Sequence, residues 1–332
     1  MTVTVVVGGF YGDEGKGKIV AYLSLSDSHS LAVRGGVGPN AGHTVLYKDQ
    51  VLKLRMLPSA VVNKSTRLLI GPGVLIDPVV ILHEATKYNA LDRLVIDRSC
   101  GIIEPNHINS DKSGFLASKV GSTGSGTGPA NAERVLRTAK LARDLDIFED
   151  YLDDIPGIVN SQIENGNDVL VEGTQGTFLS LYFGDYPFVT SKDVTASAIC
   201  SDVGLGPKKV DDVMVVFKSY VTRVGEGPFA GEISASEIKK LGWSETGTVT
   251  GRTRRAAPFD FNLARRSIML NSATSIAITK LDILFPSATG IRKYNELSSD
   301  AQAFIKNIEN ELNTSVSIIG TGAEVFDTID RR

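Results

Sequence analysis

Cysteine, tryptophan and long apolar runs are scarce in this chain of 332 residues, which contains 2 cysteines and 1 tryptophan. The cysteines, Cys100 and Cys200, stand alone, so they form neither a metal-ligand spacing nor a disulfide framework. A reducing, cytoplasmic location is therefore expected. No apolar run approaches the ~20 residues of a membrane span, and the apolar start at residues 3–7 is too short for a secretory signal.

A strong excess of either charge is also missing. The 35 basic and 38 acidic residues leave a net charge of −3, which argues against binding nucleic acid or membrane through bulk charge. Hydrophobic residues make up 42% and charged residues 22%, as in an ordinary globular protein. No convincing linker or repeat interrupts the chain, so we expect residues 1–332 to form a single domain.

The most informative segment that is present is residues 8–18, GGFYGDEGKGK. It follows the β-branched run 3–7 and precedes an apolar stretch at 19–25, an order that predicts a buried strand, a glycine-rich turn and a helix. Such a turn can close around an anion, and the helix N-terminus adds unpaired N–H groups. The segment therefore predicts a phosphate cradle.

This cradle is not a Walker A loop. Five residues separate Gly9 from Gly15, where the Walker pattern has four, and Gly17 replaces the hydroxyl that binds magnesium. Asp13 places a carboxylate inside the loop, where phosphate repels it unless a metal lies between them or it acts as a base. A purely structural turn needs neither Asp13 nor the lysines beside it.

Two further glycine-rich clusters follow. Residues 35–44, GGVGPNAGHT, place Asn40 and His43 after a short predicted strand, where they can contact a ligand or a phosphate. Residues 121–129, GSTGSGTGP, offer hydroxyl and N–H groups directly before a helix expected to start at Pro129, which makes a second candidate anion site. A flexible linker is the alternative for this second cluster.

Three later motifs complete the set. Residues 172–176, EGTQG, carry Gln175, whose amide suits a nucleobase. Residues 248–255, TVTGRTRR, suit a carboxylate or a phosphate, and a nucleic-acid patch is disfavoured because no wider basic field surrounds them. Residues 279–282, TKLD, resemble the guanine-reading signature of GTP-binding proteins, in which one carboxylate accepts from two N–H groups of guanine. Together they indicate two nucleotide-like ligands and a carboxylate ligand.

The apolar runs predict the fold. Short runs that end in glycine or polar loops alternate with helical segments, which predicts an α/β fold with a mostly parallel central sheet flanked by helices. It would resemble P-loop NTPases, with a non-Walker loop and inserted subdomains. The predicted strands are residues 3–7, 31–33, 68–70, 94–96, 169–171, 213–217 and 276–278. In the helix from Pro129 we expect Val135, Ala139 and Ala142 on one face and an i,i+4 pair between Glu133 and Arg137.

These motifs, in this order, resemble adenylosuccinate synthetase, and the likeness covers residues 3 to about 330. The segments that carry it are GDEGKGK at 12–18, NAGHT at 40–44, EGTQG at 172–176, TGR at 250–252 and TKLD at 279–282. The chain looks like the short archaeal-type form. The resemblance implies a homodimeric enzyme that joins L-aspartate to IMP with GTP and Mg²⁺, through a 6-phosphoryl-IMP intermediate, and releases adenylosuccinate, GDP and phosphate.

The resemblance also implies residue roles. Asp13, His43 and Lys16 would be catalytic, and Asp13 with the Gly42 carbonyl would hold Mg²⁺. IMP would contact Asp13, Asn40, Thr123, Gln175, Thr190, Arg252 and, from the other subunit, Arg137. Aspartate would contact Thr250, Arg252 and Arg254. GTP would contact Gly12, Gly15, Lys16, Gly17, Lys18, Gly42, His43, Thr44, Arg254, Lys280, Asp282, Gly320 and Gly322.

Two other readings stay open at this point. A phage-type relative makes a 2-aminoadenine precursor from dGMP, and in that branch a smaller residue replaces the loop aspartate, whereas Asp13 is intact here. A GTP-binding regulatory protein without ligase activity is permitted by residues 279–282 but disfavoured by the aspartate-type loop.

Overall fold

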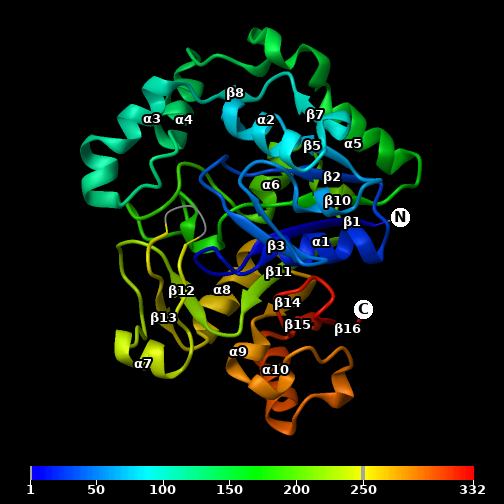
Figure 1. The fold of residues 1–332 in the computed structure, drawn as a ribbon, viewed down its shortest axis with the longest axis vertical. Coiled ribbons are helices and arrows are strands. Elements are labelled where there is room, and N and C mark those ends of the chain that lie inside the picture. Colours follow the sequence, from blue (N-terminus) through cyan, green and yellow to red (C-terminus); the bar gives the residue numbers. More distant parts are fainter. Residues whose placement is uncertain (1, 248–250) are drawn as a thin grey trace.

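A ten-stranded sheet forms the centre of the computed structural model, which describes residues 2–247 and 251–332 (Figure 1). In spatial order the strands are β16 (Thr328–Asp330), β15 (Val316–Gly320), β14 (Ser275–Thr279), β11 (Asp212–Lys218), β1 (Val3–Gly8), β10 (Val169–Glu172), β2 (Leu31–Arg34), β5 (Arg67–Ile70), β7 (Leu94–Asp97) and β9 (Leu152–Asp153). Neighbouring strands run parallel, except that β15 and β16 are antiparallel. The predicted mostly parallel sheet is confirmed.

Every predicted strand is present in this sheet. The sequence reading missed β9, β15 and β16, which lie at the two edges. β9 is only two residues long, and β16 is a short polar-ended strand, so neither has the apolar run that marks a central strand. β15 does carry such a run, VSIIG, which the reading did not include.

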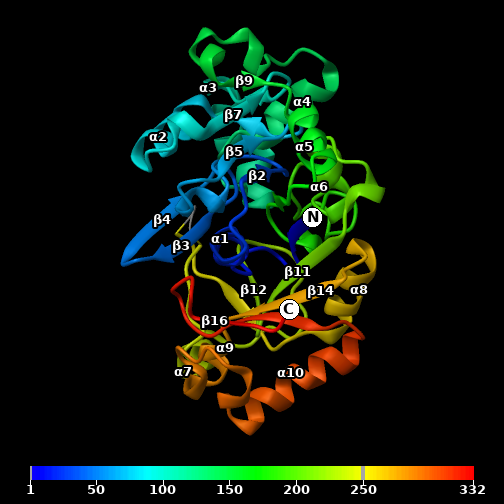
Figure 2. The ribbon, with the colours of Figure 1, turned by 90° about the vertical axis from the view of Figure 1, so that its right-hand side faces the viewer.

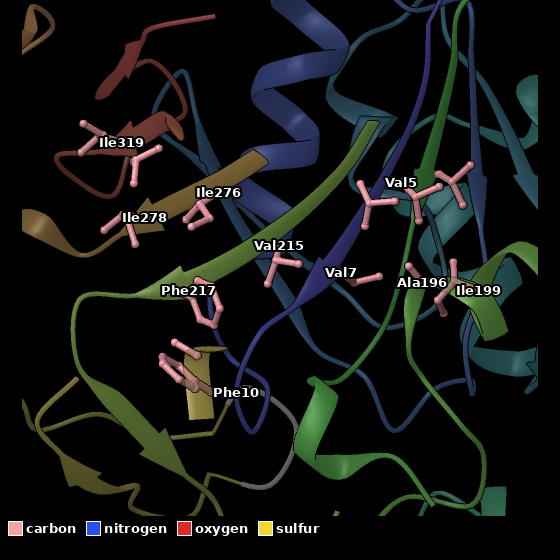
Figure 3. Packing of buried hydrophobic residues seen from close by; sticks show 14 of the residues in the cluster. Val5, Val7, Phe10, Ala196, Ile199, Val215, Phe217, Ile276, Ile278 and Ile319 are labelled. Atoms are coloured by element: carbon pink, nitrogen blue, oxygen red, sulfur yellow. The ribbon is translucent and has the colours of Figure 1, made fainter. Parts of the chain in front are cut away.

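The two faces of the sheet bury separate hydrophobic clusters. Val5 and Val7 of β1 point into one of them, with Val215 of the adjacent β11 and Ile276 of β14, the next strand along (Figure 3). Val6, between them, points into the other, as the period of a strand requires. Full burial of such a side chain contributes roughly 1.5–3 kcal/mol. Central strands that are apolar on both faces therefore need helices on both faces.

Helices provide this cover. The first cluster is closed by α5 (Ile155–Glu164), α6 (Ala196–Asp202), α8 (Phe261–Asn271) and α10 (Ser299–Leu312), and the second by α1 (Lys16–Ser26) and α2 (Pro78–Lys87). None of the helices in the described parts of the chain has the length and apolar character needed to span a membrane.

Smaller elements are inserted between the sheet strands. They are the hairpin of β3 (His43–Tyr47) and β4 (Gln50–Leu54), the antiparallel pair β12 (Val221–Arg223) and β13 (Arg255–Ala257), the parallel pair β6 (Leu75–Ile76) and β8 (Gly101–Ile102), and the helices α3 (Pro105–Lys112), α4 (Thr127–Leu136), α7 (Ala235–Lys240) and α9 (Leu281–Leu284). Figure 2 shows α3 and α4 at one end of the molecule and α7 and α10 at the other. The predicted insertions are thus observed.

One predicted helix has different limits. The helix expected from Pro129 begins at Thr127 and ends at Leu136, because Arg137 adopts the left-handed conformation with φ 66°. Such a residue commonly ends a helix. Ala139 and Ala142 therefore lie outside it, and the predicted shared face with Val135 was wrong.

The predicted Glu133–Arg137 pair was wrong for the same reason, since an i,i+4 contact requires helical backbone throughout. Glu133 instead contacts His107 of α3, with 2.9 Å between Glu133 Oε2 and His107 Nε2. This pair joins α3 to α4. It leaves the Arg137 side chain exposed at the end of α4.

Candidate active site

The carboxyl ends of the central strands open onto a cavity of about 1010 Å³. Ligands in open α/β sheets bind in this position, and the volume is at the upper end of ordinary small-molecule sites. The predicted site residues that line it are Gly12, Asp13, Gly15, Lys16, Gly17, Lys18, Asn40, Gly42, His43, Thr44, Thr123, Gln175, Thr190, Arg252, Arg254, Lys280 and Gly322. Residues from eight separate stretches of the sequence, the five motifs among them, therefore meet at one place.

The loop between β1 and α1 is organised by Glu14, which the sequence analysis did not single out. Its buried carboxylate accepts hydrogen bonds from the backbone N–H groups of Phe10 (3.0 Å) and Gly12 (2.7 Å). It also pairs with Lys16 at 2.9 Å. The Lys16 ammonium donates in addition to the Gln175 carbonyl. The cradle and the 172–176 motif are thus joined.

A glycine at position 17 is required by its neighbours. A Cβ atom there would lie 2.8 Å from the Cβ of His43 and 3.0 Å from Ser59 Oγ. The β3 strand packs this closely on the first turn of α1, so the serine or threonine of a Walker loop does not fit. The departure from the Walker pattern follows from the position of His43.

Asp13 faces the cavity in the left-handed conformation, with φ 61°. Its Oδ2 atom lies 2.9 Å from Arg254 Nη2. Burial raises the pKa of this carboxyl group, and the nearby charges of Arg254 and Lys218 oppose that rise. The Asp13 side chain is 23% exposed, so it presents a half-buried carboxylate to the cavity and pairs there with Arg254.

The ring of His43 is held by a buried carboxylate, Glu172, at the end of β10. His43 Nδ1 contacts Glu172 Oε1, which also pairs with Arg34 at 2.9 Å and accepts from the Ser59 hydroxyl at 2.6 Å. Burial and the charge of Arg34 lower the pKa of His43 to about 4. The pKa of Glu172 is lowered to about 2: burial alone would raise it, but Arg34 and His43 outweigh that effect.

Glu172 is therefore ionised and His43 neutral near pH 7. A neutral ring that donates from Nδ1 carries its lone pair on Nε2, so Glu172 sets both the tautomer and the orientation. The sequence offered one signal of this role: a charged residue at the end of an otherwise apolar strand.

Polar groups suited to a base or ribose lie beside the cradle. Asn40 Nδ2 donates to Thr190 Oγ1 at 3.1 Å. The Oδ1 atom of Asn40 and the Oε1 atom of Gln175 are buried and have no hydrogen-bond partner among residues 2–247 and 251–332. Buried acceptors of this kind are costly unless something donates to them. They indicate that a ligand completes this part of the cavity.

Arg252 connects two loops at the cavity mouth. Its guanidinium donates to the backbone carbonyls of Gly121 (2.7 Å) and Ser122 (3.2 Å). Thr123 follows in the same loop, and its hydroxyl donates to Ser125 at 2.9 Å. The glycine-rich cluster 121–129 is thus an ordered part of the cavity and not a linker.

Lys18 lines the cavity and also contacts the C-terminal loop. Its ammonium donates to the carbonyls of Gly322 and Asp327, each at 2.6 Å. Burial lowers its pKa to about 8, and the charge of Asp327 opposes that shift. Lys18 therefore ties α1 to the C-terminal loop. Gly320 lies close to it, with 3.3 Å between Lys18 Nζ and the position of a Cβ atom on that glycine.

The segment after β14 is anchored on its backbone. Lys280 has φ 61°, and its carbonyl accepts from the Ser219 hydroxyl at 2.7 Å. The Thr279 hydroxyl donates to the Glu14 carbonyl at 2.6 Å, which joins this segment to the cradle. Within the described ranges, Asp282 Oδ1 is buried without a hydrogen-bond partner.

Some predicted residues are placed elsewhere. Asp282 and Gly320 lie next to cavity residues but do not line it, and Arg137 is on the exposed end of α4. Thr250 falls outside the described residues. Besides Glu14 and Glu172, the sequence reading missed Lys218 and Glu245, which pair with each other, and Glu245 also pairs with Arg254.

Two places offer atoms of the kind that bind metal ions, and the contacts of one of them argue against a metal there. Asp13 and the Gly42 carbonyl offer oxygen ligands on the cavity wall, the kind that magnesium prefers. Glu104, His107 and Glu133 also lie close together on α3 and α4. There, however, His107 Nδ1 accepts from the Glu104 N–H at 3.0 Å, so Nε2 carries the proton and faces Glu133. That cluster is a link between helices.

The fold and the cavity define an enzyme of phosphorylated nucleotides: an α/β sheet with a phosphate cradle, a half-buried carboxylate inside it and a guanidinium group paired with that carboxylate. The family model for adenylosuccinate synthetase matches residues 5–150 and 139–289. The chain belongs to the adenylosuccinate synthetase family, whose members are ligases.

Full-length relatives agree with this assignment. The chain is 52% identical to adenylosuccinate synthetase of Methanococcus vannielii over 336 residues, covering 100% of this chain and 99% of that protein. It is 52% identical over 333 residues to that of Archaeoglobus fulgidus, with 100% and 99% covered. The predicted archaeal-type resemblance is therefore confirmed.

Solved structures show the same fold. The fully ligated adenylosuccinate synthetase of Plasmodium falciparum superposes with a TM-score of 0.92 at 25% identity, with 100% of both chains covered. The succinoaminodeoxyadenylate synthetase of cyanophage S-2L, bound to dGMP and dATP, has a TM-score of 0.81 at 24% identity, with 99% of this chain and 95% of the phage chain covered. The phage enzyme thus shares the fold.

Proposed function

We propose that this chain joins L-aspartate to IMP at the expense of GTP and releases adenylosuccinate, GDP and phosphate. The observation that carries the proposal is that the Asp13 carboxylate lies inside a phosphate cradle, in the same cavity as Gln175, Arg252 and Lys280. An acid in that position suits a reaction that removes a proton next to a phosphoryl transfer.

In the first step Asp13 accepts the N1 proton of IMP, which makes O6 nucleophilic. The pKa of Asp13 is raised by burial, so the carboxylate is a stronger base than one in water. O6 then attacks the γ-phosphorus of GTP, and the bond to the β,γ-bridging oxygen breaks. The products of this step are 6-phosphoryl-IMP and GDP.

Lys16 and His43 act on the transferring group. The Lys16 ammonium neutralises charge on the phosphates, and His43, oriented by Glu172, faces them from β3. Asp13 and the Gly42 carbonyl would hold Mg²⁺, which would supply further charge neutralisation when bound.

In the second step the amine of aspartate attacks C6, and phosphate leaves with the oxygen that was O6. Arg252, Arg254 and Thr250 bind the carboxylates of aspartate in this proposal, because guanidinium groups bind carboxylates in a bidentate fashion. Asn40, Thr123, Gln175 and Thr190 hold IMP.

Lys280 and Asp282 read the guanine of GTP, with Gly320 and Gly322 beside the base. A carboxylate accepts from both N1–H and the 2-amino group of guanine, which adenine does not offer together. The buried Asp282 Oδ1 atom supports this role, because nothing else in the described chain donates to it. Gly12, Gly15, Gly17, Lys18 and Thr44 complete the nucleotide site.

We further propose that the chain acts as a cytoplasmic homodimer of single-domain subunits (1–332), in which Arg137 reaches the IMP phosphate of the other subunit. Strands from both ends of the chain share one sheet, which supports a single domain. Arg137 is exposed and lies outside the cavity of its own subunit, which supports a role in another one.

The test is a reconstituted assay with IMP, GTP, Mg²⁺ and L-aspartate that follows adenylosuccinate by absorbance, with each component omitted in turn. Product that requires all four supports the proposal. Turnover with dGMP but not with IMP would instead favour the phage-type reaction. GTP hydrolysis that is indifferent to IMP and aspartate would favour a regulatory GTP-binding protein.

A further inference from the structure

Glu245 lies between α7 and β13, and its carboxylate is surrounded by donors from several elements. Its Oε2 atom lies 2.9 Å from the Lys218 ammonium and contacts the Arg254 guanidinium. Its Oε1 atom accepts from the Tyr220 hydroxyl and lies 3.8 Å from the Lys280 ammonium. Only 13% of this side chain is exposed.

The surroundings of Glu245 are rigid on one side. Tyr220 stacks on Trp243 with ring centroids 4.5 Å apart and an interplanar angle of 13°. Lys218, at the end of β11, also donates to the Thr222 hydroxyl at 2.8 Å and is buried. Lys218, Tyr220 and Trp243 do not line the cavity, whereas Glu245 and its partners Arg254 and Lys280 do.

Arg254 is held at both ends of its guanidinium. Nη1 pairs with Glu245, and Nη2 lies 2.9 Å from Asp13 Oδ2. The backbone N–H of Arg254 also donates to the backbone carbonyl of Glu245 at 3.0 Å. One cation therefore bridges a carboxylate that has fixed partners and a carboxylate that faces the cavity.

Bound ligands would affect the Nη1 and Nη2 ends of the Arg254 guanidinium differently. In the proposed function Asp13 has to accept a proton and bind a metal, so the oxygen that Arg254 occupies must be released. A triphosphate offers oxygens with a higher charge to the Nη2 end. No anion of a ligand competes for the Nη1 end, because the Glu245 carboxylate already occupies it.

We infer that Glu245 is a positioning residue that keeps Arg254 in the cavity while its Nη2 end exchanges Asp13 for the γ-phosphate of the bound triphosphate. This inference rests on the proposed function, in which Arg254 contacts GTP and Asp13 acts on IMP. It assigns a role to a residue on the cavity wall that the proposed function leaves without one.

The role makes a specific prediction about nucleotide affinity. Glu245 acts on the γ-phosphate through Arg254, whereas it has only a distant contact with Lys280, on the base-reading segment. Glu245→Gln should therefore weaken a non-hydrolysable GTP analogue by about tenfold, as coupled ionic pairs do, and change the affinity for GDP by less than about twofold. A general structural role would weaken both nucleotides alike.

The experiment is calorimetric titration of the full-length protein, with Mg²⁺ present, using GDP and the β,γ-imido analogue of GTP. Wild type, Glu245→Gln, Arg254→Gln and the double variant form a cycle. We expect the double variant to resemble Arg254→Gln alone, because Glu245 acts through that residue. Glu232→Gln is the matched control, since it removes the carboxylate from the adjacent Arg255–Glu232 pair outside the cavity.

Equal losses for both nucleotides, or additive losses in the double variant, would overturn the inference. Should Glu245→Gln fail to fold, Glu245→Asp keeps a negative charge beside Lys218 and Arg254 but shortens the side chain that reaches them. An unchanged ratio of the two nucleotide affinities in that variant would likewise overturn the inference. The ligase assay on wild type reports the proposed function separately, because the nucleotide titrations need neither IMP nor aspartate.

Discussion

Arg254 and Asp13 form an ion pair in the cavity, with Arg254 Nη2 2.9 Å from Asp13 Oδ2. Arg254 thereby occupies one oxygen of the carboxylate that the proposed reaction uses as its base. Because Arg254 also binds Glu245, the guanidinium has a second partner when it leaves Asp13. In the inference above, Arg254 balances the charge of Asp13 until an anionic ligand competes for the arginine.

Asp13→Asn should remove turnover and leave the fold intact. Asparagine has the same shape and tolerates the left-handed backbone at φ 61°, whereas alanine would add strain there. We expect kcat to fall about 10²–10⁴-fold, the usual contribution of a general base. Steady-state assays measure this, and an unchanged melting temperature controls for folding. Turnover like that of wild type would rule out the proposed mechanism.

Asp282→Asn should weaken GTP and shift preference toward XTP. The Oδ1 atom of Asp282 is buried without a partner in the described part of the chain, and an amide replaces one acceptor with a donor. A hydrogen bond to a charged group contributes about 2 kcal/mol, which corresponds to a loss of about thirtyfold in GTP affinity. Titrations with GTP and XTP measure the ratio. If the GTP affinity stays the same, Asp282 does not read the base.

Arg137→Gln should raise the KM for IMP, because the proposed partner of this exposed arginine is the IMP phosphate of the other subunit. Mixing it with Asp13→Asn should restore activity to about a quarter of the sites, since each random heterodimer has one site with neither change. Activity of the mixture after subunit exchange measures this. Absence of recovery, with exchange demonstrated independently, would argue against a shared site.

The ligand-free protein should lose stability as the pH falls from about 6.5 to about 4. His43 has its folded pKa lowered to about 4 from 6.5, by burial first and Arg34 second. Between these values the unfolded chain binds a proton that the native state does not, so the free energy of unfolding decreases on acidification by up to about 3 kcal/mol.

Denaturant unfolding at several pH values checks this prediction, with His43→Asn as the comparison. The variant has no ring to protonate, so its stability should depend less on pH over the same range. Glu172, with its pKa lowered to about 2, adds the same sign of change only below its ordinary value of 4.5. Parallel pH profiles for the two proteins would contradict the assignment.

Much of the fold was predictable because its signals are local. Apolar runs bounded by glycine predicted the central strands, and the run before residues 8–18 predicted β1, the cradle and α1. The end of α4 was not predictable, since Arg137 adopts a conformation that usually marks glycine. The outermost strands β9 and β16 were not predicted, because they are very short and lack the apolar run of a central strand.

By itself the sequence determined which chemical groups stand next to strand ends: Asp13 and Lys16 after β1, Gln175 after β10, Lys280 after β14. Parallel strands bring their carboxyl ends to one edge, so these groups had to meet. Only the tertiary structure decided which side chains hold them in place. His43 and Glu172 are 129 residues apart, and no local pattern links Arg254 to both Asp13 and Glu245. Such pairs form where buried charges must find partners, and burial is a property of the assembled fold.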